Sequence, residues 1–447
     1  MSEASFDAGH DKKDALVKYT DEDALNYHSK NFPGNGKIYI GSKTSLETTL
    51  DLTLAYTPGV AVACKEITKS EDYVYDYCAS SNMVGVVSNC TRVLGLGDIG
   101  PRAGLPVMEG KAILFKGFGF VDTFPVVLNE KDPDKVIDIV VAISKSFGAI
   151  NLEDIRKPDC FKIEEEVQKR VDIPIWHDDQ WGTALVTTAG FLNALKVVGK
   201  KISDVRVAMA GSGASGIAIA RMLLNAGVKG KNLILTDRNG AVYVGRKENM
   251  DFAKDRIAKD TNPDRLDGDL LSVVKKFKPD FMVGASSPKT FTKEMVKNMN
   301  TNPIVFGIAN PVPEIWPEDA FEAGAIICAT GRSDYKNQIN NVLGFPGVFR
   351  GALDVRAKTV NTEMKVAAAY SLANSVPEDK VSKDMIIPSP LDHRVYMEEA
   401  LAVAKAAMTT NVARINRTDN WIRDNFEKLR KFYMDNERPI IEKRKNY

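Results

Sequence analysis

Apolar residues follow two patterns along this chain, and the change comes at about residue 205. From Val205 onward, apolar runs of strand length alternate with helical segments, and most of the runs end at glycine or polar residues. Such alternation is typical of a parallel sheet with helices on both faces. The expected strands are Val205–Ala210, Asn232–Thr236, Asp280–Gly284, Pro303–Ile308 and Ala325–Ala329, and the expected helices are Ile217–Asn225, Lys293–Met299 and Glu318–Ala323.

The part before residue 205 also mixes strands and helices, with less regular spacing. Short apolar stretches alternate with longer helical patterns, and Gly199 ends the clearest helix. The apolar stretches are Gly85–Ser88, Ala112–Phe115, Ala149–Leu152 and Ile173–Trp176, and the helical patterns are Asp21–Lys30, Asp134–Phe147 and Gly182–Val198. Beyond Gly331 glycines become rare, and residues 352–375 and 395–447 are predicted to be helical.

These patterns predict an α/β protein with a Rossmann-type doubly wound parallel sheet and a second, mixed α/β domain. We expect a substrate and catalytic domain over residues 1–178 and a dinucleotide-binding domain over residues 179–340. The helical segment 341–447 is expected to pack back on the first domain.

The charge balance and the lengths of the apolar runs exclude two classes of partner. The 447 residues include 60 basic and 59 acidic side chains, so no net field attracts nucleic acid or an anionic membrane. The apolar runs are far shorter than the roughly 18–20 residues of a membrane span.

Histidine and cysteine usage limits the metal chemistry and the compartment. Only four histidines are present, so a multi-histidine zinc or copper site is excluded and any metal should be a hard cation bound by oxygen. The five cysteines have no paired short spacing, which indicates free, buried or half-buried thiols. Residues 1–14 lack the apolar segment of a signal peptide, so we expect a cytoplasmic protein.

A glycine-rich motif follows the strand expected at Val205–Ala210. It has the spacing G-x-G-x-x-G and consists of Gly211, Ser212, Gly213, Ala214, Ser215 and Gly216. A strand before it and a helix after it are the context that binds a dinucleotide pyrophosphate. Asp237 lies where an acid accepts hydrogen bonds from the adenosine ribose, which favours NAD. Arg238, Arg246 and Lys247 follow and are able to pair with a 2′-phosphate, so NAD and NADP both stay open.

Two acidic pairs lie about 25 residues apart, each beside a short apolar segment. Glu153-Asp154 and Asp178-Asp179 would repel one another in a cleft unless a cation neutralised them. Mg²⁺ or Mn²⁺ suits such oxygen ligands. The alternative is a helix cap for one pair and a salt bridge for the other.

Three further side chains are candidates for acid–base chemistry and for anion binding. Tyr56 lies at a Pro-Gly turn, and Lys111 enters an apolar run that would lower its pKa toward that of a base. Arg92, beside the glycine-rich stretch Gly95–Gly100, can clamp a carboxylate. Each of the three also has an ordinary structural or surface interpretation.

Taken together, these residues resemble the signatures of the malic enzymes, and the short bacterial type above all. The resemblance runs in family order from about residue 30 to 400. The motifs that carry it are Leu54-Ala55-Tyr56-Thr57-Pro58-Gly59-Val60-Ala61, Arg92-Val93-Leu94-Gly95-Leu96-Gly97-Asp98-Ile99-Gly100, Pro106-Val107-Met108-Glu109-Gly110-Lys111, Asn151-Leu152-Glu153-Asp154-Ile155, His177-Asp178-Asp179-Gln180, Asn310-Pro311 with Pro313-Glu314-Ile315, and Asn340-Asn341-Val342 with Phe345-Pro346-Gly347.

The resemblance implies a reaction and a role for each matching residue. It implies oxidative decarboxylation of L-malate to pyruvate with reduction of NAD or NADP, in a homodimer. Tyr56 would be the general acid, Lys111 the general base and Asp178 the residue that positions Lys111. Glu153, Asp154 and Asp179 would bind Mg²⁺ or Mn²⁺. Arg92 would bind a malate carboxylate, Asn310 and Asn341 would line the substrate and nicotinamide site, and Asn340 would contact the cofactor.

One position departs from the family, and three other functions stay open. Trp181 stands where short members usually carry a histidine, beside the metal ligands. His177 is then expected to support those ligands rather than to catalyse. The alternatives are a malolactic-type enzyme that releases lactate, a metal-independent oxidoreductase like the amino-acid dehydrogenases, and a nucleotide-sensing regulator without catalysis.

Overall fold

The computed structural model describes residues 20–31, 35–93 and 95–439, so the last part of the helix expected to reach residue 447 lies outside the described residues. Two parallel sheets with surrounding helices confirm the expected α/β fold. In the described part of the chain, no helix combines the length and the apolar character needed to cross a bilayer.

The first sheet has four strands, all parallel, in the order β2-β1-β3-β4. The strands are β1 (Met83–Ser88), β2 (Asp122–Val127), β3 (Ala149–Leu152) and β4 (Ile175–His177), and helices α5 (Pro101–Leu114), α6 (Pro133–Ile143) and α7 (Asp159–Arg170) connect them. Val84, Val86 and Ile150 are fully buried in it. Glu153 and Asp178 directly follow β3 and β4, so both acidic pairs lie at the same edge of this sheet.

The apolar stretch Ala112–Phe115 is not a strand. It forms the end of α5 and the start of a π-helical turn, Phe115–Gly119. Pro101 begins the helix at a position that needs no N–H donor, and the buried residues Met108, Lys111 and Ala112 follow helical spacing. Lys111 therefore projects from a helix and not from a strand.

The second sheet has six strands, in the order β7-β6-β5-β8-β9-β10. The strands are β5 (Val207–Ala210), β6 (Leu233–Asp237), β7 (Gly240–Ala241), β8 (Phe281–Gly284), β9 (Ile304–Gly307) and β10 (Ile327–Thr330), and the helices are α9 (Ala214–Ala226), α10 (Phe252–Asp260), α11 (Leu270–Phe277), α12 (Lys293–Lys297) and α13 (Pro317–Glu322). All pairs are parallel except the short edge pair of β6 and β7. The strand order reverses between β5 and β8, where such sheets bind ligands beyond the carboxyl ends of the strands.

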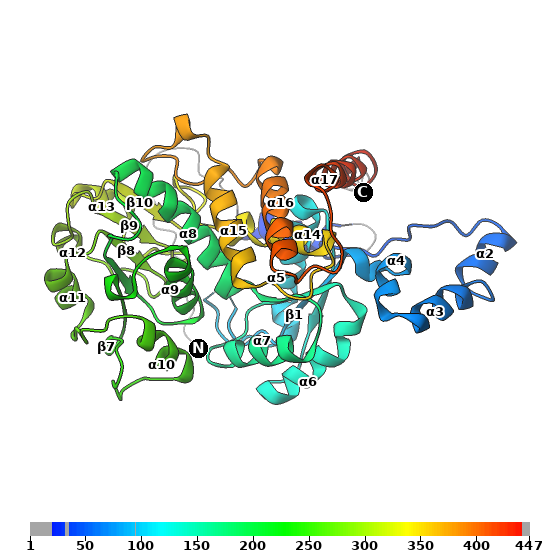
Figure 1. The fold of residues 1–447 in the computed structure, drawn as a ribbon, viewed down its shortest axis with the longest axis horizontal. Helices are drawn as coiled ribbons and strands as arrows, with labels where there is room; N and C mark the ends of the chain where they lie inside the picture. The colour runs from blue at the N-terminus through cyan, green and yellow to red at the C-terminus, as the bar shows by residue number, and fades with distance from the viewer. Residues whose placement is uncertain (1–19, 32–34, 94, 440–447) are drawn as a thin grey trace.

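The helices after residue 341 return to the first sheet. They are α14 (Phe345–Asp354), α15 (Thr362–Asn374), α16 (His393–Thr409) and α17 (Asp419–Phe432), and long helix α8 (Asp178–Val198) runs between the two sheets (Figure 1). Phe115 of the π-helical turn meets Phe345 and Phe349 of α14, with ring centroids 4.6 and 5.0 Å apart. Phe120 meets Phe426 of α17 at 5.1 Å.

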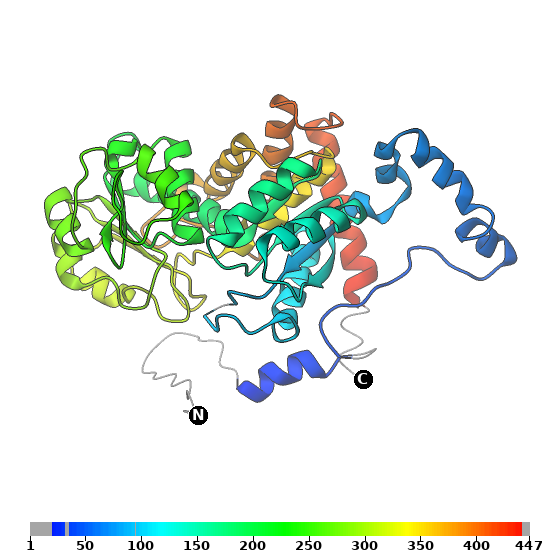
Figure 2. The ribbon, with the colours of Figure 1, turned by 90° about the horizontal axis from the view of Figure 1, so that it is seen from below.

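Near its N-terminus the chain forms a projecting segment, residues 40–69, which we call the arm. It contains α2 (Thr49–Ala55) and α3 (Val60–Lys69), and no residue of either helix is buried. In both ribbon views α2 and α3 stand away from the body of the molecule (Figures 1 and 2). Helix α1 (Asp21–Ser29) precedes the arm, and Lys37 between them bonds the carbonyl of Pro106 on α5 at 2.6 Å.

Helices α14 and α16 pack closely over a buried carboxyl group. A Cβ on Gly351 would lie 2.3 Å from the carbonyl oxygen of Ala400, and a Cβ on Gly347 would lie 2.1 Å from Oε2 of Glu399. The Glu399 side chain is fully buried, and neither of its oxygens has a hydrogen-bond partner among the described residues. Burial raises the pKa of Glu399 well above its ordinary value, so the neutral acid is the form that the fold accommodates.

This burial predicts a pH-dependent stability that Glu399→Gln removes. A raised pKa in the folded state favours folding below the ordinary carboxyl pKa, and the advantage is lost as the pH rises through the raised value. Wild type should therefore lose more unfolding free energy than Glu399→Gln between about pH 5 and about pH 8. Urea unfolding across this range measures the difference, with Glu363→Gln on the exposed surface of α15 as control. Parallel curves for wild type and Glu399→Gln would contradict the prediction.

Candidate active site

A buried lysine and two carboxylates form the centre of the candidate site. Lys111 Nζ lies 2.7 Å from Oδ2 of Asp178 and 3.0 Å from Oε1 of Glu153. The side chains of Lys111, Glu153 and Asp178 are 7%, 6% and 0% exposed. Three sequence-predicted residues from α5, the end of β3 and the start of α8 therefore meet in the interior, although 67 positions separate Lys111 from Asp178.

The pKa expected for Lys111 from sequence was wrong in direction. Burial by itself lowers the pKa of this ammonium group, but the charges of Asp178 and Glu153 outweigh burial and raise the pKa above its ordinary value. Burial raises the pKa of Glu153, and the charges of Asp179 and Asp178 add to this effect against Lys111. Lys111 is therefore a paired cation, with Asp178 as its nearer partner.

Three residues that contact Lys111, Glu153 or Asp178 were not predicted from the sequence to have a role at the site. Asn151 Nδ2 donates to Oε2 of Glu153 at 2.8 Å, and Trp176 Nε1 donates to Oδ1 of Asp178 at 3.0 Å. Lys111 Nζ lies 4.3 Å from the ring centroid of Phe345 on α14. Asn151 and Phe345 belong to motifs already noted, but only their spatial neighbours give them a role.

The two acidic pairs are brought together. Oδ2 of Asp179 accepts the backbone N–H of Asp154 at 2.8 Å and lies 3.4 Å from Nε2 of His177. Asp154 and His177 are buried, whereas 37% of the Asp179 side chain is exposed. Each acidic pair thus supplies one carboxylate, from Glu153 and Asp178, that contacts Lys111, and the other two acids are linked to each other. Over residues 20–31, 35–93 and 95–439, however, no three His, Cys, Asp or Glu side chains stand in the arrangement of a metal site.

Two of the remaining substrate-binding candidates, Asn341 and Arg92, contact residues of this cluster. Asn341 Nδ2 donates to Oδ2 of Asp178 at 2.6 Å. The backbone N–H of Arg92 donates to the carbonyl of Asp154 at 3.0 Å, and its side chain is exposed. Asn310 is exposed just beyond β9, and Asn340 caps the short helical turn that begins at Asn341.

Tyr56 is the one catalytic candidate that the structure does not bring to the lysine. It ends α2 on the arm, and 70% of its surface is exposed. A general acid must approach within hydrogen-bonding distance of its substrate. Within one chain in this conformation, Tyr56 and Lys111 belong to different parts of the molecule.

The glycine-rich motif joins β5 to α9 and has the geometry that a dinucleotide loop requires. Gly211 has a φ of 106°, and a Cβ there would lie 2.3 Å from the carbonyl oxygen of Ala285. A Cβ on Gly216 would lie 2.2 Å from the carbonyl oxygen of Gly211, so the helix packs tightly on the turn. No atom lies within 4 Å of a Cβ on Gly213, which leaves this side open to a ligand. Lys157, three residues after Asp154 in the chain, contacts this loop, because its Nζ donates to the carbonyl of Ser212 at 3.2 Å.

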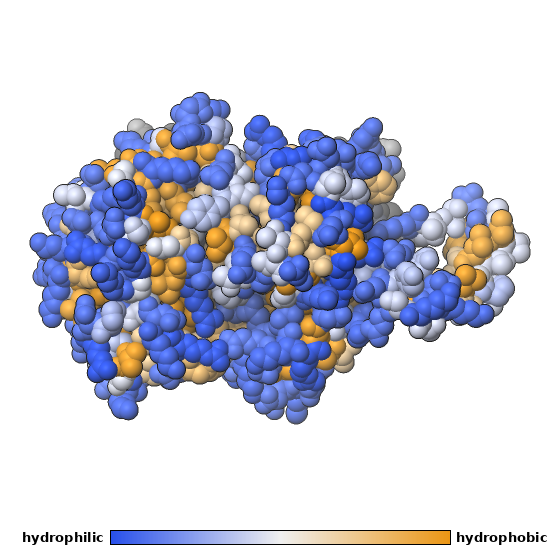
Figure 3. Space-filling view, in the orientation of Figure 1, coloured by the Kyte–Doolittle hydropathy of each residue, from blue (hydrophilic) through white to orange (hydrophobic). Residues whose placement is uncertain are grey.

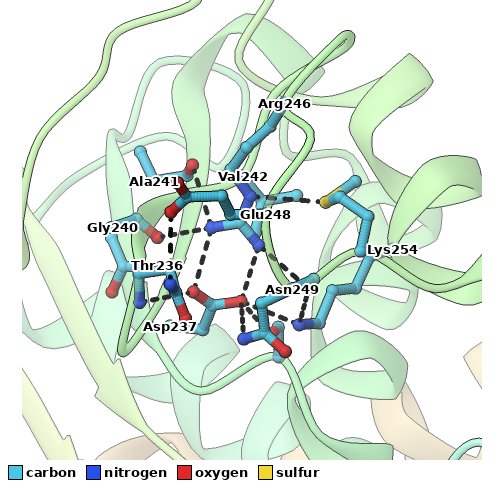
Figure 4. Close-up of polar contacts among 12 residues, drawn as sticks. Thr236, Asp237, Gly240, Ala241, Val242, Arg246, Glu248, Asn249 and Lys254 are labelled. Atoms are coloured by element: carbon cyan, nitrogen blue, oxygen red, sulfur yellow. Dashed lines mark hydrogen bonds and ion pairs between the residues drawn. The ribbon is translucent and has the colours of Figure 1, made fainter.

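Asp237 ends β6 beside this loop but is engaged by two cations. Arg246 Nη2 lies 2.6 Å and Lys254 Nζ 2.8 Å from its Oδ2 (Figure 4). Burial works against the charge of Asp237, but hydrogen bonds from Arg246 and Lys254 outweigh it and hold the pKa below its usual range. Arg238 is exposed. Lys254, on α10, carries no signal in the sequence that links it to Asp237.

Trp181, the residue that departs from the family pattern, packs beside the acidic cluster. Its Nε1 donates to Oε1 of Glu164 at 2.6 Å, and Gln180 Nε2 donates to Oε2 of the same carboxylate at 2.8 Å. Lys365 Nζ lies 3.4 Å from the centroid of a Trp181 ring. The indole thus joins α8 to α7 and α15, and this packing does not involve Lys111.

Comparison with known proteins agrees with this geometry. Residues 35–168 match the model "Malic enzyme, N-terminal domain", and residues 181–408 match "Malic enzyme, NAD binding domain". A bifunctional malic/malolactic enzyme of Bacillus subtilis is 51% identical over 91% of this chain and 98% of its own length. An NADP-dependent malic enzyme of Haemophilus influenzae is 45% identical over 89% of this chain and 54% of its own length.

Comparison of the fold with solved structures indicates the same family. A crystal structure of malic enzyme from Pyrococcus horikoshii superposes with a TM-score of 0.92 at 49% identity, over 95% of this chain and 99% of that one. The chain therefore belongs to the malic enzyme family and is an NAD(P)-dependent oxidoreductase.

Proposed function

We propose that this chain oxidises L-malate and decarboxylates the product to pyruvate and CO₂, with NAD(P)⁺ as hydride acceptor and a divalent cation bound. The observation that carries the proposal is the buried group of Lys111, Asp178 and Glu153, in a chain whose Lys157 also contacts the glycine-rich loop. The division into residues 1–178, 179–340 and 341–447 belongs to the same proposal. Helix α8 begins at Asp178, so the first boundary falls where a catalytic side chain joins the two parts.

Lys111 would accept the proton of the malate C2 hydroxyl while the C2 hydride passes to the nicotinamide. Asp178 fixes the direction of the ammonium group, and Asn341 and Trp176 in turn hold Asp178. Since its carboxylate partners raise the pKa of Lys111, the lysine becomes a base only when that negative charge is neutralised. Arg92, whose side chain is exposed beside Asp154, would bind a malate carboxylate, and Asn310 would lie near the nicotinamide.

Glu153, Asp154 and Asp179 would hold the divalent cation. Glu153 and Asp178 contact the single ammonium group of Lys111, while Asp179 accepts the backbone N–H of Asp154 and, among the described residues, pairs with no lysine. Carboxylate oxygens are the ligands that Mg²⁺ and Mn²⁺ prefer. When bound, such a cation supplies Lewis acidity at the C2 oxygen and stabilises the charge that develops as CO₂ leaves. Tyr56 would then give a proton to C3 of enolpyruvate.

The exposed arm supports a homodimer. Leu50, Leu52, Leu54 and Val62 of α2 and α3 are 64%, 58%, 62% and 65% exposed. Apolar side chains gather over the arm in Figure 3. Apolar surface of this kind is stabilised by burial against a partner. We propose that a second copy covers the arm and that Tyr56 acts beside Lys111 of the partner subunit. The five cysteines are free, which fits a cytoplasmic enzyme, but Cys64 and Cys78 are exposed and not buried or half-buried as expected.

A coupled assay with L-malate, Mn²⁺ and each nicotinamide in turn tests the reaction. We expect malate-dependent formation of reduced nicotinamide together with stoichiometric pyruvate. Removing divalent cations with a chelator should lower the rate at least about a hundredfold, and added Mn²⁺ should restore it. Activity that survives complete chelation would contradict the metal assignment, and lactate in place of pyruvate would contradict oxidative decarboxylation.

A further inference from the structure

Asp237 has no remaining capacity to bind a ribose. Its Oδ1 accepts from Arg246 Nη1 and from the backbone N–H of Asn239, both at 2.9 Å. Its Oδ2 accepts from Arg246 at 2.6 Å, Lys254 at 2.8 Å, Asn249 at 3.1 Å and Ser212 at 3.3 Å (Figure 4). A carboxylate offers about four lone-pair sites, and all are engaged before a nucleotide arrives. The rule that an acid at this position accepts the ribose hydroxyls does not fit this side chain.

The two cations are buried and anchored, so they do not release Asp237 easily. The side chains of Arg246 and Lys254 are 5% and 1% exposed. Arg246 Nη1 also donates to the carbonyls of Gly240 and Ala241 at 3.1 and 3.3 Å. Breaking a buried ion pair leaves an uncompensated charge, which is costly. The cluster is therefore part of the fold of the second sheet rather than a surface salt bridge.

The charge around this point is positive on balance. Asp237 contributes one negative charge, against the positive charges of Arg246 and Lys254. The other acids close by are Glu248, which accepts from Asn239 at 3.4 Å, and Asp251, which caps α10. Arg238 directly follows Asp237, Lys247 directly follows Arg246, and both are exposed; Lys157 contacts the Ser212 carbonyl. These five cations exceed the three acids by two charges.

Ser212 joins the loop to Asp237, because its hydroxyl group donates to Oδ2 of Asp237 at 3.3 Å. Lys157 Nζ donates to the carbonyl oxygen of Ser212, and exposed Arg238 directly follows Asp237 in the chain. A loop with a surplus of cations close by is a suitable environment for a phosphate monoester. We infer that Asp237 is a positioning residue for Arg246 and Lys254, and that this end of the cofactor site selects the 2′-phosphate of NADP over the free 2′-hydroxyl of NAD. The inference rests on the proposed function, because it assigns the nucleotide used in that reaction.

Binding of adenosine fragments tests the inference without catalysis. Calorimetry with adenosine 2′,5′-bisphosphate and with 5′-AMP compares the two ribose ends in the absence of nicotinamide and malate. We expect the bisphosphate to bind at least about tenfold more tightly and to lose this advantage as salt rises, as charge-assisted contacts do. Equal or tighter binding of 5′-AMP would overturn the inference.

Three variants assign the effect to residues. Arg238→Gln and Lys157→Gln should each reduce the preference for the bisphosphate by about threefold or more and leave 5′-AMP binding unchanged, whereas Lys297→Gln on α12 should change neither. Asp237→Asn should leave 5′-AMP affinity within about threefold, and a tenfold loss would identify a ribose acceptor and overturn the inference. If Asp237→Asn does not fold, Arg238→Gln and Lys157→Gln decide the question. An unchanged preference for the bisphosphate in both of these variants contradicts the inference.

The catalytic assay separates this inference from the proposed function. Malate oxidation that prefers NAD⁺ would overturn the nucleotide assignment and leave the reaction standing. Selective binding of the bisphosphate by a chain that does not oxidise malate would overturn the reaction and support the nucleotide assignment.

Discussion

Lys111→Arg is expected to fold and to lose turnover by about a thousandfold or more, within the range that general acid–base catalysis contributes. A guanidinium group retains the positive charge that Asp178 and Glu153 require, but it does not release its proton near neutral pH. Lys111→Ala should lose as much activity and also become less stable by roughly 3–5 kcal/mol, because two buried carboxylates lose their partner. Steady-state kinetics with malate, together with thermal unfolding of each variant, measures both effects.

The control for these variants is Lys116→Ala. Lys116 lies on the π-helical turn that follows α5 and pairs with Asp122 and Glu437 at 2.7 and 2.8 Å, outside the cluster around Lys111. Its removal should leave kcat within about threefold, as for most partly exposed ion pairs. Near-normal turnover of Lys111→Arg would refute the assignment of Lys111 as the base.

Tyr56→Phe is expected to lower kcat by about a hundredfold or more, because the hydroxyl that we propose to protonate C3 is removed while the ring remains. Mixed dimers locate this tyrosine. A dimer of one Tyr56→Phe chain and one Lys111→Arg chain contains one intact site only if Tyr56 acts beside Lys111 of the partner subunit. Mixing the two inactive variants under subunit exchange should therefore recover activity.

Two measurements make this result decisive. Sedimentation velocity establishes that the dimer forms and exchanges, and Tyr39→Phe, with an exposed tyrosine before the arm helices, is the matched control for loss of a hydroxyl group. Full subunit exchange without recovered activity would show that Tyr56 and Lys111 act within one chain. Monomeric wild-type protein with full activity would contradict the dimer itself.

Much of the second sheet was predictable, because its signals are local. Apolar runs of strand length located β5, β6, β8, β9 and β10 to within about two residues, since each run is buried on both faces of a parallel sheet. The glycine motif gave the position of the β5–α9 turn, where Gly211 has a positive φ. The stretch 112–115 was less predictable, because a short apolar run suits a strand and a buried helix face equally.

The residue types at the site were also evident from sequence, but their pKa shifts and hydrogen-bond partners were not. The motifs identified Lys111, Glu153, Asp154, Asp178 and Asp179 as the chemical groups of the site, and the expected lowering of the Lys111 pKa was nevertheless wrong. The direction of the Lys111 pKa shift depends on Asp178, whose Oδ2 lies 2.7 Å from Lys111 Nζ. This contact joins α5 to the end of β4, which lies far along the chain. The hydrogen bonding of Asp237 likewise depends on Lys254, which lies 17 residues later, on helix α10.

The sequence by itself determined the family, the order of the sheets and the residues able to carry the reaction, because local patterns of burial and turn chemistry specify those features. Only the tertiary structure decided that Lys111 is a paired cation, that Asp237 is held by two cations, and that Tyr56 stands exposed on an arm. These are properties of distance and burial between segments remote in sequence. Electrostatic energies depend on separation and on exclusion of water, and the packing of α5, α8, α10 and the two sheets sets both.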